Sequence, residues 1–220
     1  MQTRTKLNKS GIGPTELRRR VWHMAPGFLP LLLWFVPHAD PVSPRLRVIV
    51  IAIIAVLGAF IFARYRQIAR PGELRDRTAT VVGYAGSVLA MLLLFPADLE
   101  LAMTVLAVLA FGDGSATLGG LLIGGPNLPW NRKKTWAGLL CFLLVGSAMA
   151  SVVYWGETHF NPEALGPRIP FTTALICGSA AACVAGLVES LPLRLPDNIR
   201  VGLSAAITVV IAHGLMVGWP

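Results

Sequence analysis

The chain has 220 residues, of which 55% are hydrophobic and only 14% are charged. This composition excludes an ordinary soluble domain, and the length exceeds what a single membrane anchor needs. The formal charge of +8 suggests a nucleic-acid partner, but the basic residues stand at the ends of apolar segments, where the positive-inside rule and anionic headgroups account for them. We therefore expect an integral membrane protein that contacts membrane lipids and no nucleic acid.

Seven apolar stretches are long enough, or nearly so, to cross roughly 30 Å of hydrocarbon at about 1.5 Å per residue. In chain order they occupy residues 21–37, 47–63, 80–96, 98–112, 136–155, 171–188 and 201–219. Pro26 and Pro30 interrupt the first, and the fourth is short and runs straight into Gly112 and Asp113. The sequence predicts an all-α, polytopic transmembrane helix bundle of about seven spans. It divides into a basic N-terminal segment, 1–20, and a single transmembrane domain, 21–220.

The basic residues lie mostly on one side of these spans. If the amino terminus is cytoplasmic, the inside segments hold all of the 19 Lys and Arg residues except Arg45, Arg47 and Arg168. This asymmetry predicts an amino terminus in the cytoplasm and a carboxyl terminus outside. The expected location is the inner membrane of the cell if the source is bacterial.

The first polar segment precedes the first span, at residues 16–23. Glu16 and Arg20 are four residues apart, so a plain helix ion pair accounts for them. His23 follows Arg19 by about one helical turn, which leaves two interpretations: a buried structural histidine or a member of a site. The other three histidines of the chain fall at or near the opposite side of the membrane and are poor candidates for the same site.

The second polar segment, residues 111–138, contains the strongest single candidate, Asp113. An acidic residue that emerges from an apolar span is costly to place there and indicates a functional site. A glycine-rich backbone can approach phosphate closely and present its amides to it, and nearby cations neutralise phosphate charge. The glycines are Gly112, Gly114, Gly119, Gly120, Gly124 and Gly125, and the cations are Arg132, Lys133 and Lys134. Ser115 and Thr135 stand beside them as hydroxyl candidates for the same site.

Asp113 is also suited to Mg²⁺, which usually takes one or two carboxylates together with substrate phosphates. The combination predicts a triphosphate site, although no P-loop motif occurs. The alternative is that the glycines let membrane helices pack closely and that the basic run is an ordinary positive-inside anchor. Each feature alone fits this alternative, whereas an acidic residue, paired glycines and a tribasic run in one segment favour the site.

The third polar segment lies between the last two spans, where Glu189 ends an apolar stretch. Pro192 and Pro196 force a non-helical turn, and Asp197 and Asn198 then begin the last span. Either of these two residues can be no more than a helix cap. Glu189 carries its charge near the membrane boundary, which makes it the stronger site candidate.

In this order, the three segments resemble the CTP-dependent lipid kinases, a group that includes phytol kinase, dolichol kinase and CTP-dependent diacylglycerol kinase and is related to the phosphatidate cytidylyltransferases. The resemblance runs from about Glu16 to the end of the chain. Its most specific part is Gly112-Asp113-Gly114-Ser115-Ala116 through Lys134-Thr135-Trp136-Ala137-Gly138, which looks like the family's G-D-x-x-A and K-[ST]-x-E-G elements.

Two further matches indicate the phytol and dolichol kinase branch. Glu189-Ser190-Leu191-Pro192 followed by Asp197-Asn198 is similar to E-x-x-P and D-D-N, and Glu16, Arg19 and His23 are similar to E-x-x-R-K-x-x-H. Two positions depart from the pattern: Ala137 stands where the family usually has Glu, and Pro196 where it often has a second Asp. Both departures remove a carboxylate.

The resemblance implies a catalytic membrane domain that transfers the γ-phosphoryl group of CTP to a long isoprenoid or other lipid alcohol, with Mg²⁺ as cofactor. It assigns Asp113 to Mg²⁺, Glu189 or Asp197 to a second metal position or to activation of the hydroxyl, and Asn198 to orienting one of them. The glycine-rich backbone with Ser115 and Thr135, and the basic run 132–134, would hold the triphosphate. Arg19 and His23 would line the place where the lipid headgroup and the nucleotide meet.

Two alternatives remain open at this point. One is a cytidylyltransferase that attacks the α-phosphate of CTP and makes a CDP-lipid, although the signature of that group is not present. The other is a non-enzymatic transporter or scaffold, for which polar residues deep in several spans and an internal repeat would be expected. The sequence has no visible repeat, and its polar residues gather on one membrane side.

Overall fold

The structure is a computed structural model that describes residues 13–39, 41–68, 77–161 and 168–220. Within these ranges the regular elements are helices, and no strand is formed. The elements are α1 (Pro14–Met24), η1 (Ala25–Phe28), α2 (Leu29–Leu33), α3 (Pro44–Ile68), α4 (Arg77–Leu94), α5 (Leu99–Ala107), η3 (Val108–Gly112), α6 (Asp113–Leu122), α7 (Trp136–Phe160), α8 (Phe171–Ser190) and α9 (Asp197–Met216). The first twelve residues of the predicted N-terminal segment lie outside the described residues.

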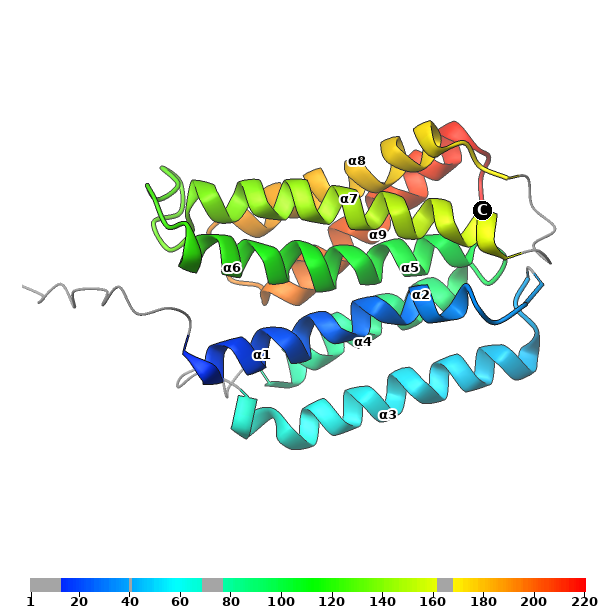
Figure 1. Ribbon diagram of the computed structural model, residues 1–220, viewed down its shortest axis with the longest axis horizontal. Coiled ribbons are helices and arrows are strands. Elements are labelled where there is room, and N and C mark those ends of the chain that lie inside the picture. The colour runs from blue at the N-terminus through cyan, green and yellow to red at the C-terminus, as the bar shows by residue number, and fades with distance from the viewer. Residues whose placement is uncertain (1–12, 40, 69–76, 162–167) are drawn as a thin grey trace, which may run out of the picture.

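These elements form seven rods, because α1, η1 and α2 follow one another as one rod and α5, η3 and α6 as another. The rods lie side by side with their long axes roughly aligned (Figure 1). In the described part of the chain, five rods are long and apolar enough to cross a membrane: α3, the α5–α6 rod, α7, α8 and α9. Helix α4 is apolar but shorter. The predicted all-α membrane bundle is confirmed.

The first rod begins earlier than the predicted span. Pro14 occupies the first turn of α1, a position where its missing N–H is not needed. Glu16 then accepts hydrogen bonds from Arg19 at 3.0 Å and from Arg20 at 3.1 Å, which confirms the predicted pair with Arg20. The segment before the predicted span is therefore helical, and it holds its cations at fixed positions on α1.

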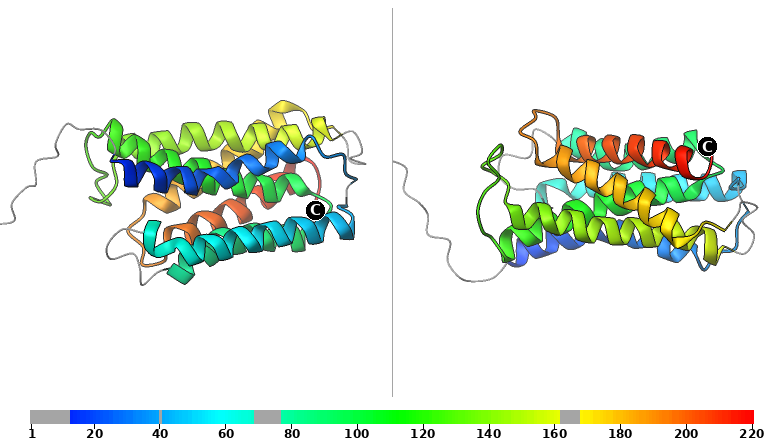
Figure 2. Two further views of the ribbon diagram at one scale, coloured as in Figure 1. Left: turned by 60° about the horizontal axis from the view of Figure 1, so that its bottom comes forward. Right: turned by 90° about the horizontal axis from the view of Figure 1, so that it is seen from above.

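The rod formed by α5, η3 and α6 is the centre of the bundle. In the most apolar stretch of this rod, 89% of the residues are buried inside the protein. In the corresponding stretch of α3, none of the residues is buried. Helix α7 packs along this rod, α8 packs against α7, and α9 packs against α8, α4 and α5. Helix α3 lies at the outside of the bundle, next to α4 and α1 (Figures 1 and 2). The central rod is thus shielded by protein, while α3 offers most of its surface to lipid.

The expected end of the fourth span at residue 112, and the loop expected over 111–138, are wrong. The helix continues through Asp113 to Leu122, and the connection to α7 covers only residues 123–135. The glycines of this helix serve close packing, because a Cβ atom at Gly112 would collide with Phe142 of α7 and one at Gly119 with Cys141 of α7. They let α6 approach α7 closely, which is the packing alternative that the sequence left open.

Candidate active site

The three polar segments meet at one end of the bundle, around a cavity of about 770 Å³. Its walls come from α1, α4, the start of α6, the 123–135 loop, the end of α8 and the start of α9. These parts lie at the end of the bundle where α1 begins (Figure 1). The polar and charged residues of the lining are Arg19, Arg20, His23, Thr80, Tyr84, Asp113, Thr117, Lys133, Lys134, Thr135, Glu189, Ser190, Arg194, Asp197 and Asn198.

Asp113 is held at the cavity wall by a histidine from the first rod. It directly follows η3, a π-helical turn of the kind that often occurs at functional sites. Its Oδ2 atom lies 3.0 Å from Nε2 of His23, and the same nitrogen lies 3.0 Å from the carbonyl oxygen of Leu109. Since both neighbours are acceptors, Nε2 carries the hydrogen and donates to them. Tyr84 supports His23 by donating to its carbonyl oxygen at 3.0 Å.

A second charged group surrounds Lys134. Its amino group contacts Glu189 directly and lies 3.1 Å from Oδ2 of Asp197. Glu189 is 3% exposed and lies in the last turn of α8, and Asp197 is the first residue of α9. Arg200, one turn further along α9, pairs with Asp197 and donates to carbonyl groups at the end of α8. One lysine and one arginine therefore join two helix ends across the connecting turn.

The charge of Lys134 is secured by its surroundings. Burial alone would lower the pKa of its amino group, but the carboxylates of Glu189, Asp197 and Asp113 outweigh burial and hold the pKa of Lys134 above its usual value. The amino group is thus a permanent cation at the cavity wall, with acidic groups on several sides. Such a group can exchange a carboxylate partner for a phosphate without any proton transfer.

The 123–135 loop is folded onto the end of α8. Gly124 and Gly125 have φ values of 68° and 95°, a backbone conformation that favours glycine, and they turn the chain out of α6. Trp130 then donates from Nε1 to the hydroxyl of Ser190 at 3.1 Å, and Asn131 donates to the carbonyl oxygen of Ser190 at 3.0 Å. These two bonds fix the loop, and with it the two lysines that follow, over the cavity.

The structure brings most of the predicted site residues to this cavity. Those that line it are Arg19, His23, Asp113, Gly120, Lys133, Lys134, Thr135, Glu189, Asp197 and Asn198. Those outside the lining are Gly112, Gly114, Ser115, Gly119 and Arg132. The two interpretations of His23 combine, because this residue packs structurally against Leu109 and also faces the cavity beside Asp113.

The expected phosphate loop of exposed glycine amides is wrong. The backbone from Asp113 to Leu122 is α-helical, so most of its amides are used in helix hydrogen bonds. Ser115 donates its hydroxyl to the carbonyl oxygen of Cys141 at 3.0 Å, which ties α6 to α7. The positive charge that lines this cavity therefore comes from cationic side chains and not from these helix amides.

Two other predicted residues also have structural hydrogen bonds. Thr135 caps α7, since its hydroxyl accepts from the backbone N–H of Gly138 at 3.1 Å. Asn198 donates its side-chain amide to the carbonyl oxygen of Thr80 at 2.9 Å, which joins α9 to α4. The helix-cap alternative for Asn198 is not observed. Its amide instead holds together two walls of the cavity.

The three predicted metal ligands all lie at the cavity, but in different places. Asp113 pairs with His23, whereas Glu189 and Asp197 share Lys134. Among the described residues, their oxygen atoms do not form one preformed cluster. Oxygen donors of this number and kind fit Mg²⁺, which binds proteins through one or two carboxylates and completes its shell with phosphate and water.

Six polar lining residues were not predicted as site residues: Arg20, Thr80, Tyr84, Thr117, Ser190 and Arg194. Arg20 was interpreted only as the helix partner of Glu16, and Tyr84 and Thr117 stand within apolar or glycine-rich runs. A single tyrosine in a membrane span, whose hydroxyl needs a partner there, was the available signal for Tyr84. Nothing in the sequence marked Thr117, which lies about one helical turn after Asp113.

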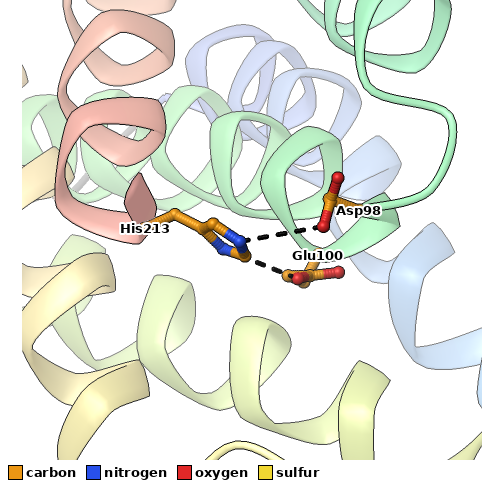
Figure 3. A group of neighbouring side chains, drawn as sticks. All are labelled: Asp98, Glu100 and His213. Atoms are coloured by element: carbon orange, nitrogen blue, oxygen red, sulfur yellow. Dashed lines mark ion pairs between the residues drawn. The ribbon is translucent and has the colours of Figure 1, made fainter. Parts of the chain in front are cut away.

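A separate polar cluster lies at the other end of the rods, formed by Asp98, Glu100 and His213 (Figure 3). The imidazole nitrogens are 3.7 Å from each carboxylate, and Tyr154 lies 2.7 Å from Nδ1. The acidic residues stand at the start of α5, where the helix dipole stabilises negative charge, and the histidine lies in the last turn of α9. Of the four histidines only His23 lines the cavity, as their positions along the chain predicted.

Comparison with known proteins gives relatives of one kind. The chain is 28% identical to probable phytol kinase 2, chloroplastic, of Oryza sativa subsp. japonica, over 91% of this chain and 67% of the relative. It is 24% identical to the chloroplastic phytol kinase 1 of Arabidopsis thaliana, over 94% and 70% of the two chains. It is 23% identical to the chloroplastic farnesol kinase of the same plant, over 92% and 67%.

No protein-family model and no solved structure matches the chain. The similarity to the plant kinases nevertheless extends over nearly the whole sequence, and it includes the three segments that meet at the cavity. The chain is therefore a homologue of the phytol and farnesol kinases, the lipid-alcohol kinase group that its motifs predicted.

Proposed function

We propose that this protein is a membrane-embedded lipid kinase that transfers the γ-phosphoryl group of CTP to the hydroxyl of a long-chain isoprenoid alcohol. The observation that carries the proposal is the composition of one continuous cavity. At one end it has five cations, three carboxylates and a histidine, and further into the bundle its walls are apolar. A polyanionic nucleotide and an alcohol with a hydrocarbon tail are the two reactants that such a cavity suits.

The cationic side chains are assigned to the triphosphate. Lys133 and Lys134 reach the cavity from the loop, Arg194 from the turn after α8, and Arg19 from α1. Asp113, Glu189 and Asp197 supply the carboxylate oxygens for Mg²⁺, which when bound would neutralise charge on the phosphates of CTP. Neither Ala137 nor Pro196 provides a carboxylate, so these three residues carry the acidic chemistry of the cavity.

The reaction needs positioning and charge neutralisation more than covalent help from the protein. The alcohol oxygen attacks the γ-phosphorus while the bond from that phosphorus to the β-phosphate oxygen breaks, and CDP leaves. The hydroxyl proton passes to a carboxylate at the cavity wall, for which Glu189 or Asp197 is our candidate, because both face Lys134 at the cavity and Asp113 is assigned to Mg²⁺. Lys134 remains protonated throughout and shifts from the carboxylates toward the phosphates.

We further propose that the cavity faces the cytoplasm, where CTP is present. The distribution of basic residues supports this orientation, because the cavity lies on the side that carries most of them. In a bacterial cell the site would then face inward from the inner membrane. The alcohol would reach the site from the bilayer, where its hydrocarbon tail is already dissolved.

The test is the product pattern with purified protein in lipid nanodiscs. CTP labelled in the γ-phosphate or in the base is supplied with Mg²⁺ and with farnesol or phytol, or in a parallel sample with phosphatidate, and products are separated by thin-layer chromatography. The proposal requires a labelled lipid phosphate and CDP. Release of pyrophosphate with a CDP-lipid would instead establish the cytidylyltransferase alternative, and equal turnover with ATP would refute the choice of nucleotide.

A further inference from the structure

The inner half of the cavity is an apolar groove between four rods. Its residues come from the first rod, from α3, from α4 and from the central rod. They are Trp22, Pro26, Leu29, Ile54, Leu57, Gly58, Ile61, Val81, Ala85, Val88 and Leu106. Below, "the groove" denotes this set. It continues directly from the charged end of the cavity, so a molecule whose headgroup lies at Asp113 has its tail in the groove.

The groove is short compared with a membrane span. Along α4 its lining runs from Thr80 beside the charged end to Val88, a rise of about 12 Å for an α-helix. Along α3 it runs from Ile61 to Ile54, or about 10 Å. An extended hydrocarbon advances roughly 1.25 Å per carbon, given bonds of about 1.5 Å at angles near 111°. The groove therefore holds about eight to ten main-chain carbons.

The outer wall of the groove is α3, which has the bilayer on its other side. None of its apolar window is buried inside the protein, and residues such as Val56 are exposed on the face away from the groove. The contact of α3 with the first rod includes an aromatic pair, Trp22 and Phe60, with ring centroids 5.6 Å apart. The part of a tail that is too long for the groove can therefore extend past α3 into the bilayer.

The smallest residues of the groove lie where α3 contacts α4. Gly58 and Ala85 face each other there, since a Cβ built on Gly58 would lie 3.8 Å from that of Ala85. Ala85 follows Thr80 by five residues, so it lies about 7.5 Å along the helix from the charged end. A substrate tail reaches this level at about its sixth carbon.

We infer that the groove recognises the first two isoprene units of the alcohol, with Gly58 and Ala85 determining specificity, and leaves the rest of the tail in the bilayer. This inference rests on the proposed kinase function. Because lipid tails are as apolar as the groove, burial gives no net hydrophobic gain, and the groove selects by shape. The enzyme then does not discriminate between alcohols that differ only beyond about ten carbons.

The experiment compares Ala85→Phe with the matched control Ala90→Phe. Ala90 is on the same helix but exposed and outside the cavity lining. Each protein in nanodiscs is given the five-carbon alcohol 3-methylbut-2-en-1-ol, geraniol, farnesol and phytol, as fractions of total lipid. We expect Ala85→Phe to lower kcat/KM about ten- to a hundred-fold for the three longer alcohols, as overpacking does, and to leave the five-carbon alcohol unchanged.

The control should match the wild-type protein with all four alcohols, and Gly58→Val should reproduce the pattern of Ala85→Phe from the facing helix. An equal loss for all four alcohols, or no loss for any, would overturn the inference while leaving the kinase function intact. A wild-type kcat/KM that keeps rising from geraniol through farnesol to phytol would also overturn it. If wild-type protein phosphorylates none of the alcohols, the proposed function itself has failed.

Discussion

Replacement of Lys134 by Met tests the charged group that joins the loop, α8 and α9. The substitution keeps the length of the side chain and removes its charge. Glu189, at 3% exposed, then loses the cation that its carboxylate contacts. Asp197 loses less, because Arg200 still pairs with it and its side chain is 45% exposed. The perturbation therefore acts mainly on one buried carboxylate.

The expected loss of stability is about 3 to 4 kcal/mol. Removing one partner of a buried ion pair costs about 3–5 kcal/mol, and the lower end applies because the Lys134 side chain is 28% exposed. The pair with Asp197 is closer to a surface ion pair and adds at most about 1 kcal/mol. In a chain of this size each kcal/mol shifts Tm by about 2–4 °C, so a decrease of about 6–16 °C should follow.

Thermal unfolding of the detergent-solubilised protein measures this shift, and a double variant gives the control. In Lys134→Met combined with Glu189→Gln no buried charge is left unpaired, so most of the lost Tm should return. Activity should stay low in both, since the triphosphate has lost a cation. A single variant as stable as wild type, or a double variant no better than the single one, would refute the ion-pair account of this group.

The same pair has a defined dependence on pH. Since the folded-state pKa of Lys134 is raised, its contribution is fully present below the ordinary lysine pKa of about 10.4 and is lost as pH rises through the raised value. The Tm difference between wild type and Lys134→Met should thus not fall as pH rises from about 6 to 9, and it should be smaller at the acid end, where a protonated Glu189 needs no cation. A difference that disappears as pH rises through that range would show that the lysine is not held as a cation.

Three further substitutions have expected outcomes. Asp113→Asn should lower kcat for lipid phosphorylation about a hundred-fold or more without reducing the yield of membrane-inserted protein; full turnover would remove Asp113 from the site. Gly119→Val should lower stability by about 1–3 kcal/mol, because its side chain meets Cys141, and an unchanged Tm would contradict the close packing of α6 on α7. His38→Leu removes the 2.7 Å hydrogen bond between His38 and Glu157, and Glu157 is only 1% exposed. We therefore expect a loss of stability of about 1–3 kcal/mol with KM for CTP unchanged. An altered KM would indicate coupling to the distant cavity.

The helical segments could be predicted because hydrocarbon thickness imposes a minimum length on apolar runs. The prediction was wrong where a polar residue was treated as the end of a helix. Asp113 does not end its helix, because His23 pairs with its carboxylate inside the protein. Likewise, residues 16–20 are helical because Glu16 pairs with two arginines. In both places the partner came from folded geometry, which hydropathy does not contain.

The candidate site was predictable in its charged residues and less so in its backbone. Charges at the ends of apolar stretches need partners, so Glu189 and Asp197 meet Lys134, and Asp113 meets His23. The glycines led to a wrong prediction of the backbone of α6, because two different physical demands select the same residue type. Approach to a phosphate and approach to a neighbouring helix both exclude a Cβ atom, and only the position of α7 decided between them.

The π-helical turn at residues 108–112 makes this part of the chain sensitive to length as well as to residue identity. Each residue of an α-helix adds about 100° of rotation. Loss of a single residue from the turn, even an alanine with no polar atom in its side chain, would restore a regular helix. It would swing every later side chain of α6 by that angle, with Asp113 moving away from His23 and the glycines leaving α7. A relative that kept all the charged residues but lacked one position here would have the carboxylate that corresponds to Asp113 facing the wrong helix.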